Sequence, residues 1–109
     1  MRRIITYQWV RLASKTEHPP MLCEKGDRVR FTWESNFHSV STMGSERNYV
    51  SCNFRNQGTI GHKSAGSAEF LCEERGTKYF SCPEGDHCSV GQLKLQIHVT
   101  DALRTLSLR

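Results

Sequence analysis

The 109-residue sequence lacks long hydrophobic runs, internal repeats and low-complexity tracts. No stretch approaches the roughly 20 apolar residues that a helix needs to cross a bilayer, so no membrane span is expected. Outside residues 101–108, no apolar pattern at helical spacing exceeds two turns, which leaves strands as the dominant element. The composition, with 37% hydrophobic and 24% charged residues, is typical of one soluble globular domain.

Charge of one sign is not concentrated anywhere in the chain. The formal net charge is only +4, and the basic residues are scattered from Arg2 to Arg104. Nucleic-acid binding calls for a clustered basic stripe, preferably with interleaved aromatic residues. The sequence therefore argues against a nucleic-acid partner and leaves open a mild preference for acidic partners.

Cysteine, in contrast, is abundant. Five cysteines in so short a chain indicate an oxidising compartment. Two arginines precede the first apolar stretch, but Thr6, Tyr7 and Gln8 interrupt it, which favours a strand over a signal peptide. We therefore expect a secreted, extracellular or periplasmic protein whose signal peptide is absent from the sequence given.

The odd number of cysteines allows two disulfides and leaves one thiol, for which metal ligation is one explanation.

Apolar residues alternate with polar ones at a period of two, which predicts strands. The clearest strand follows the turn signal at 26–27, where Val29, Phe31 and Trp33 alternate with polar neighbours. Further strands are predicted at 5–9, 39–42, 49–54, 68–72, 78–82 and 93–99, of which 49–54 is the weakest. The polar segments 14–20 and 56–66 are predicted to be a linker and a surface loop.

About seven short strands in a chain of this length imply an all-β fold, a two-sheet Greek-key β-sandwich. We assign residues 1–100 to this single domain and residues 101–109 to a C-terminal tail. Trp9 and Trp33 are expected in its core. A rigid sandwich of this kind can carry a metal site on the loops at one end.

Residues with metal-binding chemistry gather in segment 82–92, CPEGDHCSVGQ. This segment places a thiol, an imidazole and a carboxamide at steps of five residues, and an isolated histidine lies far upstream. Two imidazoles and a thiolate, with a weak axial oxygen or thioether, are the ligands of a blue-copper electron-transfer site. The chain offers one candidate for each position: His38, Cys82, His87 and Gln92.

Each candidate also has an ordinary structural explanation. Cys82 would then be a buried inert thiol or a disulfide partner, His38 a loop histidine, and Gln92 a polar strand residue. Met21 and Met43 are alternative copper ligands, but neither has motif spacing, so packing is the better interpretation. The remaining histidines are expected in solvent: His18, His62 and His98.

Several segments together resemble the phytocyanins, a family of cupredoxins that includes stellacyanins and plantacyanins. The matching segments are 25–31 (KGDRVRF), 37–40 (FHSV), Cys52, 76–82 (GTKYFSC) and 85–92 (GDHCSVGQ). They extend the resemblance over about residues 25–99. Their order, the four-residue gap between Cys82 and His87, and the cysteine directly after His87 make it specific. The resemblance implies a cupredoxin-like sandwich that carries electrons.

The resemblance also implies a role for individual residues. It makes the two histidines and the cysteine equatorial copper ligands and the glutamine an axial ligand, as in stellacyanins: His38, Cys82, His87 and Gln92. Cys52 and Cys88 would form the disulfide that holds the copper loop.

The family pattern predicts a lysine directly after the axial ligand, where Leu93 stands before Lys94. One extra residue flips every later side chain across the sheet unless a β-bulge absorbs it. The strand at 93–99 is therefore where the chain departs from the pattern.

The two remaining cysteines, Cys23 and Cys72, lie outside the family pattern. Each belongs to a Cys-Glu segment shortly before a glycine turn, at Gly26 or Gly76. If these turns lie at the same end of the sandwich, the two cysteines are neighbours on adjacent strands. We therefore hypothesise a second disulfide between Cys23 and Cys72.

The leading functional hypothesis is a type 1 (blue) copper protein that acts as a single-electron carrier. Its expected cofactor is copper, and its expected partner is a redox protein or a small electron donor or acceptor. The protein itself is expected to be a monomer. Alternatives are copper storage or delivery, a zinc site on the same residues, or a non-redox binding module on a cupredoxin fold. Catalysis is the weakest alternative, because the motif lacks a second metal set, a Ser/His/Asp arrangement and paired carboxylates.

Overall fold

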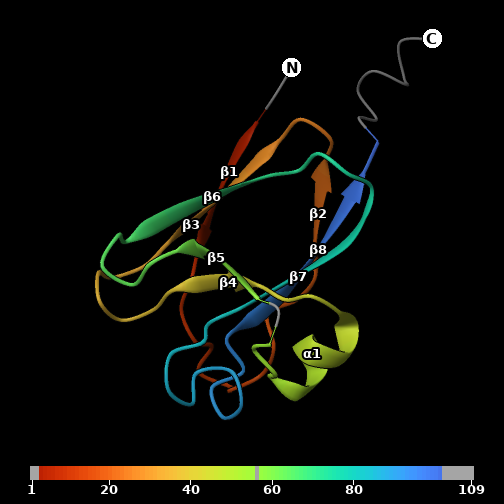
Figure 1. Cartoon of the computed structure of the whole chain (residues 1–109). Coiled ribbons are helices and arrows are strands. Elements are labelled where there is room, and N and C mark those ends of the chain that lie inside the picture. Colours follow the sequence, from red (N-terminus) through yellow and green to blue (C-terminus); the bar gives the residue numbers. More distant parts are fainter. Residues whose placement is uncertain (1–2, 56, 102–109) are drawn as a thin grey trace, which may run out of the picture.

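The computed structural model describes residues 3–55 and 57–101, which form two sheets around a common core (Figure 1). The three-stranded sheet has the order β1-β3-β6, with bounds Ile4–Gln8, Arg28–Thr32 and Ser67–Leu71. The five-stranded sheet has the order β2-β8-β7-β4-β5, with bounds Met21–Glu24, Lys94–Thr100, Gly76–Ser81, Val40–Thr42 and Gly58–Gly61. The predicted all-β sandwich is therefore confirmed, with eight strands in the described residues.

The N-terminal part of the chain supplies an edge strand to each sheet. β1 pairs with β3 in parallel and β2 pairs with β8 in parallel, whereas the other neighbouring strands are antiparallel. β8 ends at Thr100, so the expected tail of residues 101–109 lies, apart from Asp101, outside the described residues. No helix in the described part of the chain is long and apolar enough to span a membrane.

Alternation along the strands places apolar side chains between the sheets. Val29 and Phe31 of β3 are fully buried, while Arg30 between them pairs on the outer face with Glu69 of β6 (Nη2–Oε2 2.7 Å). β8 repeats the pattern with the buried residues Leu95, Ile97 and Val99. The period-two prediction is therefore confirmed for both strands.

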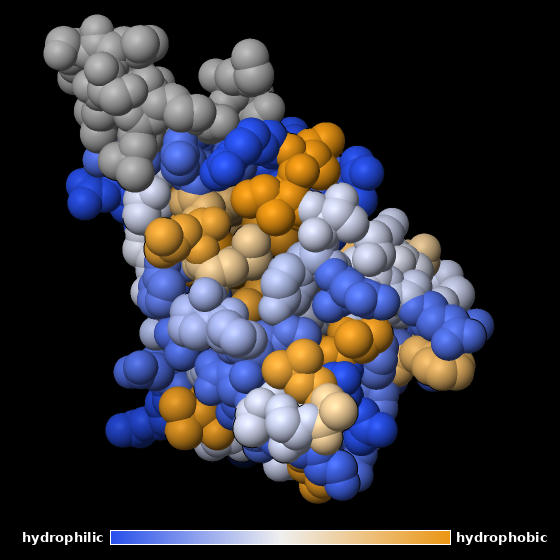
Figure 2. All heavy atoms as spheres, turned by 180° about the vertical axis from the view of Figure 1, so that it is seen from behind, coloured by the Kyte–Doolittle hydropathy of each residue, from blue (hydrophilic) through white to orange (hydrophobic). Residues whose placement is uncertain are grey.

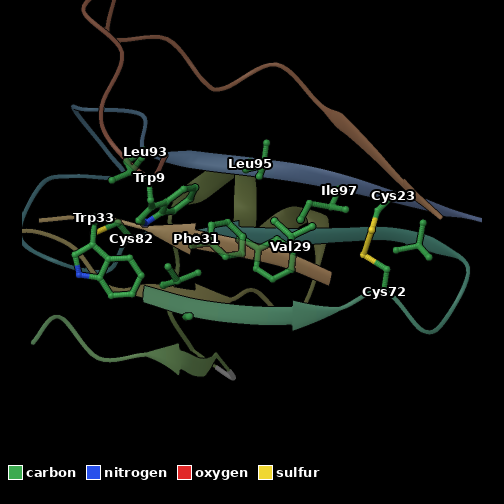
Figure 3. Packing of buried hydrophobic residues seen from close by; sticks show 14 residues of the cluster. Trp9, Cys23, Val29, Phe31, Trp33, Cys72, Cys82, Leu93, Leu95 and Ile97 are labelled. Carbon is green, nitrogen blue, oxygen red and sulfur yellow. A yellow bond between two sulfur atoms is a disulfide. The ribbon is translucent and has the colours of Figure 1, made fainter. Parts of the chain in front are cut away.

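The buried cluster runs along the length of the sandwich (Figure 3). Trp33 and Cys82 lie at one end of this cluster, and the disulfide described below lies at the other. Trp9 and Trp33 have exposed fractions of only 0% and 8%, which confirms their predicted place in the core. Trp9 packs edge-on against Phe31 with 5.1 Å between the ring centroids. Burial of each large ring stabilises the fold by on the order of 3 kcal/mol.

The strand predicted at 49–54 is wrong, because this region contains the helix α1 (Glu46–Ser51). The Ser45 hydroxyl accepts a hydrogen bond from the Asn48 amide and so caps the N-terminus of the helix (3.2 Å). At the other end, the buried Lys94 ammonium donates to the Tyr49 carbonyl (3.2 Å). Local capping and a distant cation therefore override the strand preference of this short segment.

The loop predicted at 56–66 is partly wrong, because β5 forms within it and pairs with β4. Its last residue, Gly61, lies so close to the other sheet that an added Cβ would stand 2.5 Å from Ala68 Cβ and 2.8 Å from the Trp33 ring. The glycine that suggested a loop is thus required for close packing of a strand. β2 was also not predicted, since its pairing partner β8 lies far along the chain.

The surface is mostly hydrophilic but carries five large apolar side chains in the described residues: Ile4, Leu22, Phe37, Val50 and Val90. In the rear view, apolar side chains gather in the upper half of the molecule, toward the end of the sandwich where β8 terminates (Figure 2). Single exposed apolar residues are normal in a folded domain. Phe37 and Val90 lie in the two loops described next.

Candidate metal centre

The three residues expected as equatorial ligands come from two loops at one end of the sandwich. His38 lies between β3 and β4, Cys82 directly follows β7, and His87 lies between β7 and β8. Their ligand atoms all lie within 4.8 Å of one another. The structure therefore brings together side chains that are as much as 49 positions apart in the sequence.

The donor atoms of these residues face one another. His38 Nδ1 lies 3.1 Å from His87 Nδ1, and Cys82 Sγ lies 3.2 Å from the same His87 nitrogen. The two imidazole rings meet edge to face, with their centroids 4.9 Å apart. Two imidazoles and a thiol, with no carboxylate among the three donors, fit copper or zinc and do not fit magnesium or calcium.

The cluster is largely hidden from solvent. Cys82 is fully buried, His38 is 8% exposed, and His87 is half-buried. Burial raises the pKa of the Cys82 thiol, although nearby backbone amides oppose this shift. Burial, together with the charges of His87 and Arg11, lowers the pKa of His38. A neutral His38 keeps a nitrogen lone pair for a metal, and metal binding would convert the thiol to a thiolate.

Two hydrogen bonds fix the backbone beside the ligands. The Trp9 indole Nε1 donates to the Ser39 carbonyl inside the core (2.9 Å). The Ser39 hydroxyl donates to Glu84 Oε2 (2.7 Å). Because Ser39 follows His38 and Glu84 lies two residues after Cys82, the second bond ties the two ligand loops together. Sequence patterns could not identify these contacts, since each joins residues at least 30 positions apart.

His18, which we expected in solvent, is instead buried next to Trp9, with an exposed fraction of 4%. Its ring stacks on Trp9, with 5.8 Å between the centroids. Nε2 lies 2.7 Å from the Val10 carbonyl and Nδ1 lies 2.6 Å from the Tyr7 hydroxyl. A carbonyl only accepts, so Nε2 carries the proton and Nδ1 accepts the Tyr7 hydrogen bond. The expectation was wrong because the neutral ring is satisfied at both nitrogens within the fold.

Two disulfides leave Cys82 as the free thiol. The first joins Cys88, directly after His87, to Cys52 at the C-cap of α1, with the Cα atoms 5.9 Å apart. It fastens segment 82–92 to the helix. The second joins Cys23 to Cys72 (Cα–Cα 6.4 Å) at the opposite end of the core (Figure 3).

This chain has one residue more than the family pattern before Lys94, and the backbone accommodates it at Gln92. This residue has a left-handed backbone (φ +56°), and the Lys94 amide donates back to its carbonyl (2.9 Å). Leu93 is consequently fully buried and continues the inward phase of β8. The Gln92 side-chain amide donates to the Ser89 carbonyl (3.1 Å), which ties this side chain back to its own loop.

The other histidines of the described residues do not belong to this group of donors. His62 is exposed, as expected, whereas His98 is half-buried, with Nδ1 2.8 Å from the Thr77 hydroxyl. Met43 is buried and Met21 packs against the core cluster, in agreement with a packing role.

A β-sandwich that brings two histidines and one cysteine together at one end has the arrangement of the cupredoxin class. The family model of the plastocyanin-like domain matches residues 22–92. Cucumber peeling cupredoxin from Cucumis sativus is 37% identical over 83 residues, which cover 76% of this chain and 59% of the cucumber protein. Stellacyanin from Toxicodendron vernicifluum is 31% identical over 96 residues, which cover 88% of this chain and 80% of that protein.

The similarity extends to a solved structure. Cucumber stellacyanin with Cu²⁺ matches this fold with a TM-score of 0.62 at 31% identity, over 83% of this chain and 74% of that chain. The chain belongs to the phytocyanins, within the family of plastocyanin-like domains. It spans less than two thirds of the length of cucumber peeling cupredoxin.

Proposed function

We propose that this phytocyanin domain is a type 1 copper protein that passes single electrons. The observation that carries the proposal is the convergence of His38, Cys82 and His87 ligand atoms within 4.8 Å. Copper held there would supply a one-electron couple between Cu(I) and Cu(II). A solved relative that contains Cu²⁺ supports this choice of metal over zinc.

The residues of the chain would act as a fixed set of ligands. His38, Cys82 and His87 would hold the copper, and we assign Gln92 Oε1 as an additional, weaker ligand. The Cys82 backbone amide donates to the Leu93 carbonyl (3.1 Å), which fixes the backbone of this ligand beside the residue that precedes β8. A ligand set that is held by the surrounding fold rearranges little when the metal changes charge, so electron transfer requires little structural change.

The half-buried His87 ring is the route by which an electron would leave the site. Phe37, beside His38, is 57% exposed, and Val90, in the loop of His87, is 53% exposed. A small apolar surface of this kind suits a transient contact. We therefore assign a redox protein or a small electron donor or acceptor as the partner, with the carrier monomeric between encounters.

The proposed location follows from the cysteines. Two disulfides favour an oxidising environment, so the protein would act outside the cell or in a periplasm as a secreted protein. A carrier of this kind turns over no substrate of its own, so we assign it no enzymatic activity.

Adding Cu(II) to the metal-free protein should produce an intense visible band from charge transfer between the thiolate and copper. Cys82→Ser should abolish this band, because a hydroxyl group does not replace the thiolate. His62→Gln, at an exposed histidine that is not one of the clustered donors, should retain it. Reversible voltammetry would separate a carrier from a storage protein, which should release its metal readily to a chelator. A colourless wild-type complex would overturn the proposal.

A further inference from the structure

A second site lies directly beside the proposed copper centre. A hollow of about 340 Å³ opens between the loop that carries His38, the turn between β5 and β6, and the start of segment 82–92. Its lining is mainly polar: Asn36, Ser39, Thr59, Lys63, Ser64 and Glu84. This volume lies within the range of small-molecule sites, which begins at roughly 300 Å³.

Two residues that line the hollow are direct neighbours of candidate ligands in the sequence. Ser39 directly follows His38, and Pro83 directly follows Cys82, and both line the hollow. A molecule bound there would therefore contact residues that are one peptide bond from two of the ligands. The Pro83 ring supplies an apolar surface within an otherwise polar lining.

The walls are already fixed without a ligand. The Lys63 carbonyl accepts hydrogen bonds from the Asn36 amide (2.7 Å) and the Trp33 indole (3.0 Å). The Ser35 hydroxyl donates to the Ser64 carbonyl (2.9 Å). These bonds join the loop of His38 to the turn between β5 and β6 (Figure 1). A preformed hollow loses little conformational freedom when it binds a ligand, which favours affinity.

The charges at the hollow indicate the kind of ligand. Lys63 and His62 are exposed, and their side chains have no ion pair or hydrogen bond with any other residue of 3–55 or 57–101. Glu84 lines the same hollow, and its Oε2 accepts a hydrogen bond from the Ser39 hydroxyl. A carboxylate has further lone pairs for a second donor, so a lysine and a carboxylate in one lining suit a molecule with one carboxylate and at least one hydroxyl group.

We propose that this hollow binds a small hydroxylated organic acid, with its carboxylate on Lys63 and a hydroxyl on Glu84, as an electron donor to the carrier. The donor role rests on the proposed function, whereas the binding itself does not. In that role the donor would lose one electron to copper held by His38, Cys82 and His87, its hydroxyl O–H bond would break, and the proton would pass to solvent water. Ser39 and Pro83, which line the hollow one residue from His38 and Cys82, would keep the path of the electron short.

Binding of a dihydroxybenzoate to the full chain, with Cu(I) bound and without metal, tests the proposal by amide NMR shifts. The shifts should concentrate at Asn36, Thr59, Ser64 and Glu84. Lys63→Gln should weaken binding about tenfold, because it removes a charge-assisted contact. Lys25→Gln, at an exposed lysine in the turn between β2 and β3, should leave binding unchanged.

Shifts spread over the surface, or equal affinity in the Lys63 and Lys25 variants, would overturn the binding site. Benzoate, which lacks hydroxyl groups, should bind more weakly than dihydroxybenzoate to the wild type, and Glu84→Gln should reduce that difference. A blue copper protein that fails to bind would disprove the hollow alone. Specific binding to a chain that stays colourless with Cu(II) would instead disprove the electron-carrier function and the donor role.

Discussion

Gln92 is the side chain through which the chain can set the preference of the site for one oxidation state. A carboxamide oxygen is a harder ligand than a thioether and should favour Cu(II), because the axial ligand tunes the potential of such sites. Gln92→Met should therefore raise the reduction potential measured by voltammetry. Gln57→Met, at an exposed glutamine, should leave the potential unchanged. An unaltered potential in the Gln92 variant would remove Gln92 from the ligand set.

His18 should make the stability of the protein depend on pH. Burial lowers its pKa below the ordinary value of 6.5, so the folded protein takes up its proton at lower pH than the unfolded chain. The stabilisation is complete above the ordinary value and is lost as the pH falls toward the folded pKa. The urea midpoint should therefore fall more steeply from about pH 7 to about pH 5 in the wild type than in His18→Gln.

The same variant measures what the His18 hydrogen bonds contribute. His18→Gln should cost about 1–3 kcal/mol at neutral pH, because the Val10 carbonyl and the Tyr7 hydroxyl lose partners inside the fold. His62→Gln should keep both the wild-type stability and its pH dependence. Equal pH slopes in the wild type and the His18 variant would contradict the neutral buried ring.

Among the secondary-structure elements, α1 is the one that a disulfide joins to the ligand loop, through its C-cap Cys52. Ser45→Ala should destabilise the protein by about 1 kcal/mol in chemical denaturation, because the Asn48 amide loses its cap. Ser51→Ala is the matched control, since its exposed hydroxyl only bonds back to the Arg47 carbonyl, and it should stay within about 0.5 kcal/mol. Equal losses in the two variants would show that the cap is not the source of stability.

Prediction from sequence succeeded where the pattern is local. β3 and β8 carry an uninterrupted alternation, and spacing alone indicated that Cys82 and His87 belong to one site. The pattern failed for β2, because its partner β8 lies far along the chain, and for β5, because its glycines indicated a loop rather than close packing. His18 was misjudged because its partners Tyr7 and Trp9 surround it only after β1 has joined the core.

Considered as one molecule, the protein has a disulfide at each end of its core. Removing Cys52–Cys88 by the double alanine variant should lower stability by about 2–5 kcal/mol and also speed the loss of copper to a chelator, because the ligand loop loses its anchor. Removing Cys23–Cys72 should cost a similar amount of stability but leave the visible band and the rate of copper loss unchanged. Equal rates of copper loss in the two variants would contradict a specific role for Cys52–Cys88.

The pairing of β2 with β8 joins residues 21–24 to the last strand of the described chain. A ribosome delivers β2 first and leaves it without its neighbour until β8 has been synthesised. The same late strand follows Leu93, whose carbonyl receives the Cys82 amide. A nascent chain therefore lacks the complete ligand support until β8 has emerged, and we expect the ion to be acquired only after that point.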